Sequence, residues 1–75
     1  MHSTTEFSRL VAMIELAGQI DNILAGAGIT YQSLDLSRNA NKIIDNPKRY
    51  IPRTDHRVRA AVVELVKEWQ ELRVA

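Results

Sequence analysis

The 75-residue sequence contains no cysteine, only three glycines and two prolines, and four aromatic residues. The absence of cysteine excludes disulfide bonds, cysteine-based metal sites and a cysteine nucleophile. A chain of this length buries only about 60% of its unfolded surface, so its core is small. We therefore expect stability to come from helix packing, which a second copy or a partner could complete.

Several further signals are absent. No apolar run approaches the ~20 residues of a membrane-spanning helix, and no basic stretch precedes the first apolar run as in a signal peptide. A soluble, cytoplasmic protein is expected. His2 and His56 have no further metal-ligating side chains at a suitable spacing, and no serine or paired carboxylate sits in a catalytic pattern. The sequence predicts neither an enzyme nor a cofactor or metal site.

The clearest helix signal lies near the C-terminus. Thr54 or Asp55 is a suitable N-cap, and a stripe of apolar residues follows at spacings of three and four. The stripe consists of Val58, Ala61, Val62, Leu65, Trp69 and Leu72. We expect a helix over residues 55–73, with Trp69 either in the core or anchoring an interface.

The N-terminal segment carries a second helix signal. Ser3 and Glu6 are spaced as a capping box, and Gly26-Ala27-Gly28 predicts the end of the helix, so we expect it over residues 5–25. One apolar face contains Phe7, Leu10, Val11, Ile14, Ala17 and Leu24. A further arc of Met13, Leu16, Ile20 and Ile23 makes the apolar surface wide enough for two neighbours. This arc predicts either a second intramolecular contact or a partner-binding or dimer surface.

The middle of the chain predicts shorter elements. Thr30 and Ser37 are both suitable caps, which favours two helices over residues 30–36 and 37–45, although one continuous helix is the alternative. Asn46-Pro47 ends this region, and an extended connection holding Tyr50 and Ile51 against the core is expected to follow.

Together these elements predict an all-α fold: a small single-domain bundle of three to four helices spanning residues 1–75. The predicted core contains Phe7, Leu10, Val11, Ile14, Leu24, Leu34, Ile43, Ile44, Val58, Val62, Leu65 and Trp69.

Charge is distributed unevenly along the chain. Ten basic and nine acidic residues give a net charge of +1, but seven of the ten basic residues lie within residues 38–59, which we call the basic segment. Only Asp45 and Asp55 oppose them there, so the basic segment carries +5. This asymmetry is the main functional signal in the sequence.

The residue types in the basic segment suit nucleic acid. Arginine pairs with guanine edges, asparagine pairs with adenine edges, and lysine neutralises phosphate. The candidate nucleic-acid-binding residues are Arg38, Asn39, Asn41, Lys42, Lys48, Arg49, Arg53, Arg57 and Arg59. Arg57 and Arg59 are two positions apart and face different sides of a helix, while a phosphate at that helix N-terminus would be favourable. The alternatives are a solvated basic face and a surface for an acidic protein.

Two short stretches resemble known families. Residues 57–65, after the Tyr50-Ile51-Pro52 loop, resemble the third helix of lac-repressor-type DNA-binding headpieces, and Ser37-Arg38-Asn39 resembles the start of a recognition helix. That resemblance implies DNA binding, but residues 29–37 are about one turn shorter than the family's first helix and turn. Residues 24–31 are similar to a fragment of the theta subunit of bacterial replicative polymerase, which implies an accessory protein. Neither resemblance covers more than a third of the chain, and we assign the chain to neither family.

The sequence thus leads to two functional hypotheses. The first is a small DNA-binding regulatory protein that uses the basic segment, with duplex DNA as its partner. The second is an adaptor, inhibitor or accessory subunit that binds a protein through the apolar face of the first helix or through the basic segment. In both cases a homodimer is compatible with the sequence, and no membrane association is expected.

Overall fold

The computed structural model confirms the all-α prediction, with four helices and no strand among the residues that it describes. It describes the backbone of residues 2–29, 35–52 and 54–75, and the side chains of residues 5–29, 35–52 and 54–75. The helices are α1 (His2–Gly26), α2 (Leu36–Asp45), α3 (Pro47–Tyr50) and α4 (His56–Val74). Two sequence predictions, the helix over residues 30–36 and the core position Leu34, depend on residues 30–34, which lie outside the described residues.

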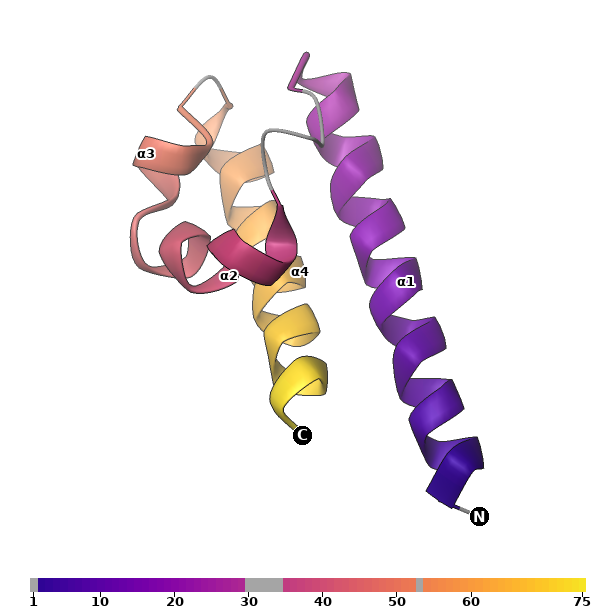
Figure 1. Ribbon diagram of the computed structural model, residues 1–75. Helices are drawn as coiled ribbons and strands as arrows, with labels where there is room; N and C mark the ends of the chain where they lie inside the picture. The colour runs from indigo at the N-terminus through magenta and orange to yellow at the C-terminus, as the bar shows by residue number, and fades with distance from the viewer. Residues whose placement is uncertain (1, 30–34, 53) are drawn as a thin grey trace.

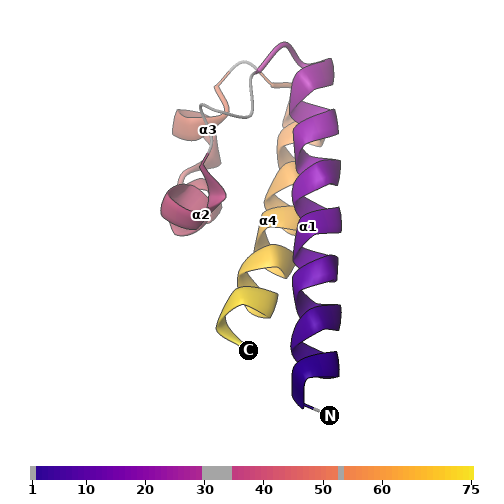
Figure 2. The same cartoon turned by 45° about the vertical axis from the view of Figure 1, so that its right-hand side comes forward.

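Helices α1 and α4 form an antiparallel pair, with both chain termini at the same end (Figure 1). Helix α2 packs against α4, and α1, α2 and α4 together surround one core, while α3 contacts α2 and α4 (Figure 2). The molecule is elongated, 43 × 22 × 20 Å, because α1 is longer than every other helix. Its 25 residues span about 37 Å, whereas the 19 residues of α4 span about 28 Å.

Helix α1 ends as the glycines predict. The Ile29 amide donates to the Leu24 carbonyl at 2.8 Å, and the Gly28 amide donates to the Ala25 carbonyl at 3.0 Å. Gly28 has a φ of +79°, so these bonds form a Schellman motif with glycine at its left-handed position. The helix start differs from the prediction, because α1 begins at His2, before the expected cap Ser3.

Two glycine substitutions test this description of α1. Gly28→Ala forces a Cβ into the left-handed region and should cost about 1–2 kcal/mol of unfolding free energy. Gly18 lies within α1, where an added Cβ meets nothing within 4 Å, so Gly18→Ala should stabilise by about 1 kcal/mol. Urea unfolding followed by circular dichroism measures both changes. Shifts of the same sign would contradict the assigned helix end.

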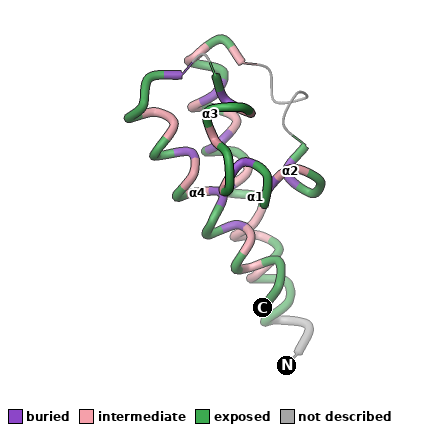
Figure 3. The backbone as a smooth tube through the Cα atoms, turned by 90° about the vertical axis from the view of Figure 1, so that its left-hand side faces the viewer, coloured by how far each residue is buried: buried purple, intermediate pink, exposed green. Residues whose placement is uncertain are grey.

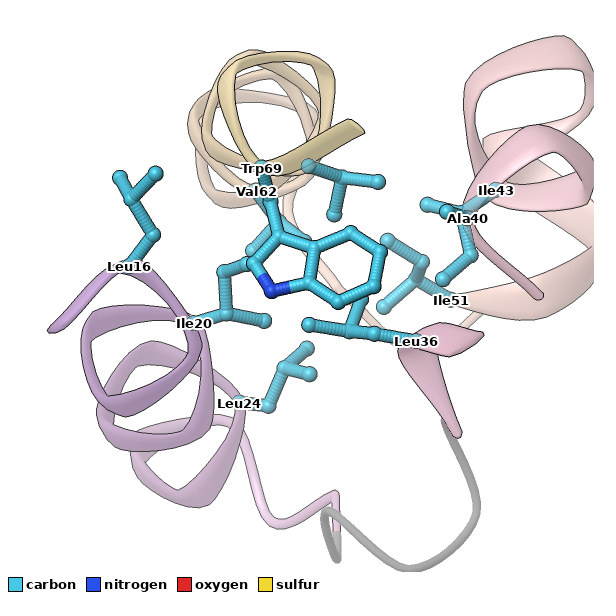
Figure 4. Close-up of a cluster of buried hydrophobic side chains, with 10 residues drawn as sticks. Leu16, Ile20, Leu24, Leu36, Ala40, Ile43, Ile51, Val62 and Trp69 are labelled. Atoms are coloured by element: carbon cyan, nitrogen blue, oxygen red, sulfur yellow. The ribbon is translucent and has the colours of Figure 1, made fainter. Parts of the chain in front are cut away.

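The core lies where α1, α2 and α4 meet, and Trp69 is at its centre (Figure 4). Its buried members are Leu16, Ile20, Leu24, Leu36, Ala40, Ile43, Ile51, Val62, Val66 and Trp69. Of the predicted core, Leu24, Ile43, Val62 and Trp69 are buried, and Ile44, Val58 and Leu65 pack partly buried against them. Ile51 is fully buried and Tyr50 packs against the cluster, as predicted.

The core prediction is wrong for the N-terminal half of α1. Phe7, Leu10 and Ile14 are exposed, and Val11 is only half-buried. The buried residues of α1 are Leu16, Ile20 and Leu24, of which only Leu24 belongs to the predicted core, and they repeat every four residues. Figure 3 shows buried positions recurring along the helices between exposed and half-buried ones. The C-terminus of α4 reaches only as far as Arg9, whose Nη1 donates to the Ala75 carbonyl at 2.9 Å.

A second correction concerns the segment after Asn46. We expected an extended connection, but Pro47–Tyr50 forms the one-turn helix α3. Proline fits the first position of a helix, because it has no N–H to lose there and its fixed φ is already helical. Asn46 therefore ends α2 and directly precedes α3.

Candidate nucleic-acid interface

Helix α2 presents part of the basic segment to solvent. Leu36, Ala40 and Ile43 are buried on one face, so the opposite face carries Arg38, Asn41 and Lys42, all exposed. Asn39 lies at the margin and is half-buried. Asp45 is also exposed on the outer face, at the C-terminal end of the helix. The N-terminal two turns of the outer face are therefore its basic part.

The start of α2 is fixed by Asp35 and not by Ser37, which lies inside the helix. An Asp35 carboxylate oxygen accepts from the Ser37 hydroxyl at 2.7 Å and from the Ser37 amide at 3.1 Å. The Arg38 guanidinium lies 3.6 Å from the other Asp35 oxygen. Arg38 therefore has a carboxylate beside it and is the least available cation of α2.

The Asp35 carboxyl should titrate abnormally. The hydroxyl of Ser37 is the main cause that lowers the pKa of Asp35 below its ordinary 3.8, with smaller contributions from the Ser37 amide and from Arg38. The ionised Asp35 cap therefore stabilises α2 fully at a pH above the ordinary pKa of 3.8. This stabilisation is lost as the pH falls through the lowered pKa of Asp35. We expect Ser37→Ala to move the pKa of Asp35 back toward 3.8, measured by NMR titration of the side-chain carboxyl. An unchanged pKa would contradict the observed Asp35–Ser37 bond.

Helix α3 adds the exposed side chains of Lys48 and Arg49. The Arg49 guanidinium lies 6.0 Å from the centre of the Tyr50 ring, at the outer limit of a cation–π contact. Because α3 contacts both α2 and α4, these two cations are held next to the other basic elements by the fold.

The first turn of α4 separates Arg57 from Arg59, as their spacing predicts. Arg57 is exposed, whereas Arg59 is half-buried and its Nη1 donates to the Thr54 carbonyl at 3.2 Å. The Asp55 carboxylate accepts from the Arg57 amide at 2.7 Å, so the helix N-terminus already holds an anionic group. A phosphate at that N-terminus would have to displace Asp55, and the expectation of a phosphate there is not supported.

The described part of the basic segment lies on α2, α3 and the start of α4, three elements that contact one another. Helix α3 and the start of α4 lie toward the end of the molecule away from both chain termini (Figure 1), whereas the first turn of α2 reaches the last turn of α4, where Arg73 Nη1 donates to the Ser37 carbonyl at 2.8 Å. We call this surface of α2, α3 and the first turn of α4 the basic end. Lys42, Lys48, Arg49 and Arg57 are exposed, and none forms an ion pair with a described residue. We call these four the free cations. Arg53 lies outside the described residues.

Of the two alternatives for the arc of Met13, Leu16, Ile20 and Ile23, the structure shows the intramolecular contact. Leu16 and Ile20 are in the core, and Met13 and Ile23 pack half-buried against it. The exposed apolar face of α1 instead carries Phe7, Leu10 and Ile14. The spacing of three and four from Phe7 to Ala17 predicts an apolar helix face here. The spacing of the buried residues predicts an apolar face as well, so spacing alone does not show which face is exposed.

Two other kinds of feature are absent from the described part of the chain, a metal site and a membrane-spanning helix. No group of three or more metal-ligating side chains converges within residues 5–29, 35–52 and 54–75. None of the helices is long and apolar enough to cross a bilayer. Comparison with known proteins finds no matching protein family, no matching curated protein and no matching solved structure.

Proposed function

We propose that the chain is a small DNA-binding regulatory protein of the cytoplasm that contacts duplex DNA through its basic end. The observation that carries this proposal is the placement of the four free cations. They come from three consecutive helices that contact one another, so the fold concentrates positive charge that a net charge of +1 conceals.

Phosphate binding is the main contribution of such a surface. Each cation placed on a phosphate releases condensed counterions, and this release supplies sequence-independent affinity. Lys48 and Arg49 on α3 and Arg57 on α4 suit this role, because they are exposed and pair with no carboxylate among the described residues. Arg59 donates a hydrogen bond to the Thr54 carbonyl in the loop before α4. We therefore expect Arg59 to hold this loop in place and not to bind a phosphate.

Helix α2 is the element suited to the major groove. Its ten residues span about 15 Å, and Arg38 and Asn41 on its outer face carry side chains that pair with base edges. Asp45 would face phosphate if the whole outer face were inserted, so the part of α2 that we expect to enter the groove is its first two turns, which include Arg38 and Asn41.

The test is fluorescence anisotropy of a labelled duplex titrated with the protein over a series of salt concentrations. Logarithmic affinity should fall linearly with logarithmic salt concentration, by about 0.9 units for each neutralised phosphate. A variant with glutamine at Lys42, Lys48, Arg49 and Arg57 should lose about 3–4 units of that slope. Lys67→Gln is the matched control, because Lys67 lies on α4 near Glu64 and outside the basic end.

Two outcomes would overturn the proposal: no binding at micromolar protein in low salt, or binding that the quadruple variant retains. In either case the remaining hypothesis for the basic end would be that it binds an acidic protein through the same charges.

A further inference from the structure

The N-terminal half of α1 exposes more apolar surface than any other described element. Phe7 is 68% exposed, Leu10 52% and Ile14 71%. Exposed apolar side chains scattered singly are common, but a contiguous group on one helix face marks an interaction site. With Ala17 these residues form what we call the α1 stripe.

The spacing of the α1 stripe indicates what kind of element covers it. Residues 7, 10, 14 and 17 are separated by three, four and three positions, which is the seam that a helix presents to another helix. No charged residue belongs to the stripe, so charge does not select its partner. The expected occupant is therefore a helix with an apolar seam of its own.

An open groove continues the stripe toward the core. It is lined mainly by Leu10, Met13, Ile14, Ala17, Leu36 and Trp69, with Asp35 and Ser37 at its edge, and its volume is about 540 Å³. The same molecule thus carries a protruding aromatic side chain, Phe7, and a groove at the level of Ala17. Such a pair of features on one face is self-complementary under a two-fold axis.

An antiparallel pairing of two α1 helices satisfies both features at once. If the two-fold axis passes beside residue 12, Phe7 of each copy lies level with Ala17 of the other, one of the residues that line the groove. Leu10 then lies level with Ile14 in both directions. In this register Glu6 is level with Gly18 and Glu15 is level with Arg9, so no two like charges are level.

We propose that the α1 stripe is the surface of an antiparallel homodimer, in which Phe7 of one copy enters the groove of the other. The inference rests on α1, the groove and Trp69, and it does not depend on the proposed DNA binding. A 75-residue chain with a small core gains buried apolar surface in this way.

Sedimentation equilibrium from micromolar to millimolar protein tests the proposal. We expect a reversible dimer, and Ile14→Asp should weaken it at least about 100-fold, because two uncompensated carboxylates would face the seam. Gln19→Asp adds the same charge to α1 at an exposed position on the opposite side from the stripe, and should leave the dimer intact. Circular dichroism should show both variants folded, since neither position is buried.

The orientation has its own test, which the absence of cysteine makes simple. A single Asn22→Cys variant carries one spin label per copy at an exposed position. In the antiparallel pair the two labels are offset by twenty residues, or about 30 Å along the helices, whereas a parallel pair would hold them within about 20 Å. A monomer at millimolar concentration, or a short label-to-label distance, would overturn the proposal.

Discussion

Replacing Ile20 with aspartate is expected to unfold the protein, whereas the same replacement at Ile14 leaves it folded. Ile20 is 1% exposed, at the contact of α1 with α4, so Ile20→Asp buries an unpaired carboxylate and removes a core side chain. The combined cost of about 5 kcal/mol or more is comparable with the whole stability of a domain this size. Ile14 is exposed, and its aspartate remains hydrated.

Far-UV circular dichroism with urea unfolding separates the two variants. The pair is well matched, because both residues are isoleucines on the same helix and both receive the same charge. Ile14→Asp should change the unfolding free energy of the monomer by less than about 1 kcal/mol. If Ile14→Asp unfolded the chain and Ile20→Asp did not, the assigned buried face of α1 would be wrong.

Trp69→Ala is expected to be the second most damaging substitution. The indole lies at the centre of the core between residues of α1 and α2, and the Arg73 guanidinium lies 5.6 Å from the centre of its ring (Figure 4). Truncating such a residue costs about 3–5 kcal/mol, because the cavity cannot collapse fully. The Arg73 side chain, which also donates to the Ser37 carbonyl at 2.8 Å, would lose its contact with the ring.

Trp69→Phe is the matched control for this prediction. It keeps an aromatic ring in the core, so it should cost clearly less than Trp69→Ala, and circular dichroism follows both variants without a tryptophan signal. Equal losses for the two variants would show that packing at Trp69 is not what holds α1, α2 and α4 together.

The sequence predicted the bounds of α2 and α4 to within one residue at each end, although the N-cap of α2 is Asp35 and not the predicted Ser37. Asp55 accepts from the amide of Arg57, as an N-cap should, and Leu36, Ala40 and Ile43 fall on one face. The sequence could not predict α3, because Asn46-Pro47 both ends α2 and begins another helical turn.

The buried face of α1 could not be chosen from the sequence. Phe7, Leu10 and Ile14 are spaced by three and four residues, and Leu16, Ile20 and Leu24 are spaced by four, so each set places large apolar side chains on one side of a helix. Only the length and placement of α4 decide between them, because α4 packs along the second set and ends level with Arg9. Periodicity identifies faces, but the partner element selects which one is buried.

The candidate interface was easier to predict from the sequence than the buried face of α1. Charge clustering alone located Lys42, Lys48, Arg49 and Arg57, since exposed cations need no packing partner. Charge clustering could not show which of the cations already bind other groups of the folded chain. The Arg59 bond to the Thr54 carbonyl and the contact of Arg38 with Asp35 depend on the loop before α4 and the turn before α2.

NMR tests most directly our proposal that the basic end binds duplex DNA. An isotope-labelled sample is titrated with duplex in low salt, and amide chemical shifts are followed residue by residue. We expect the changes to concentrate on α2, α3 and the first turn of α4, and to disappear as salt is added. Changes confined to α1, or no change at all, would contradict the claim.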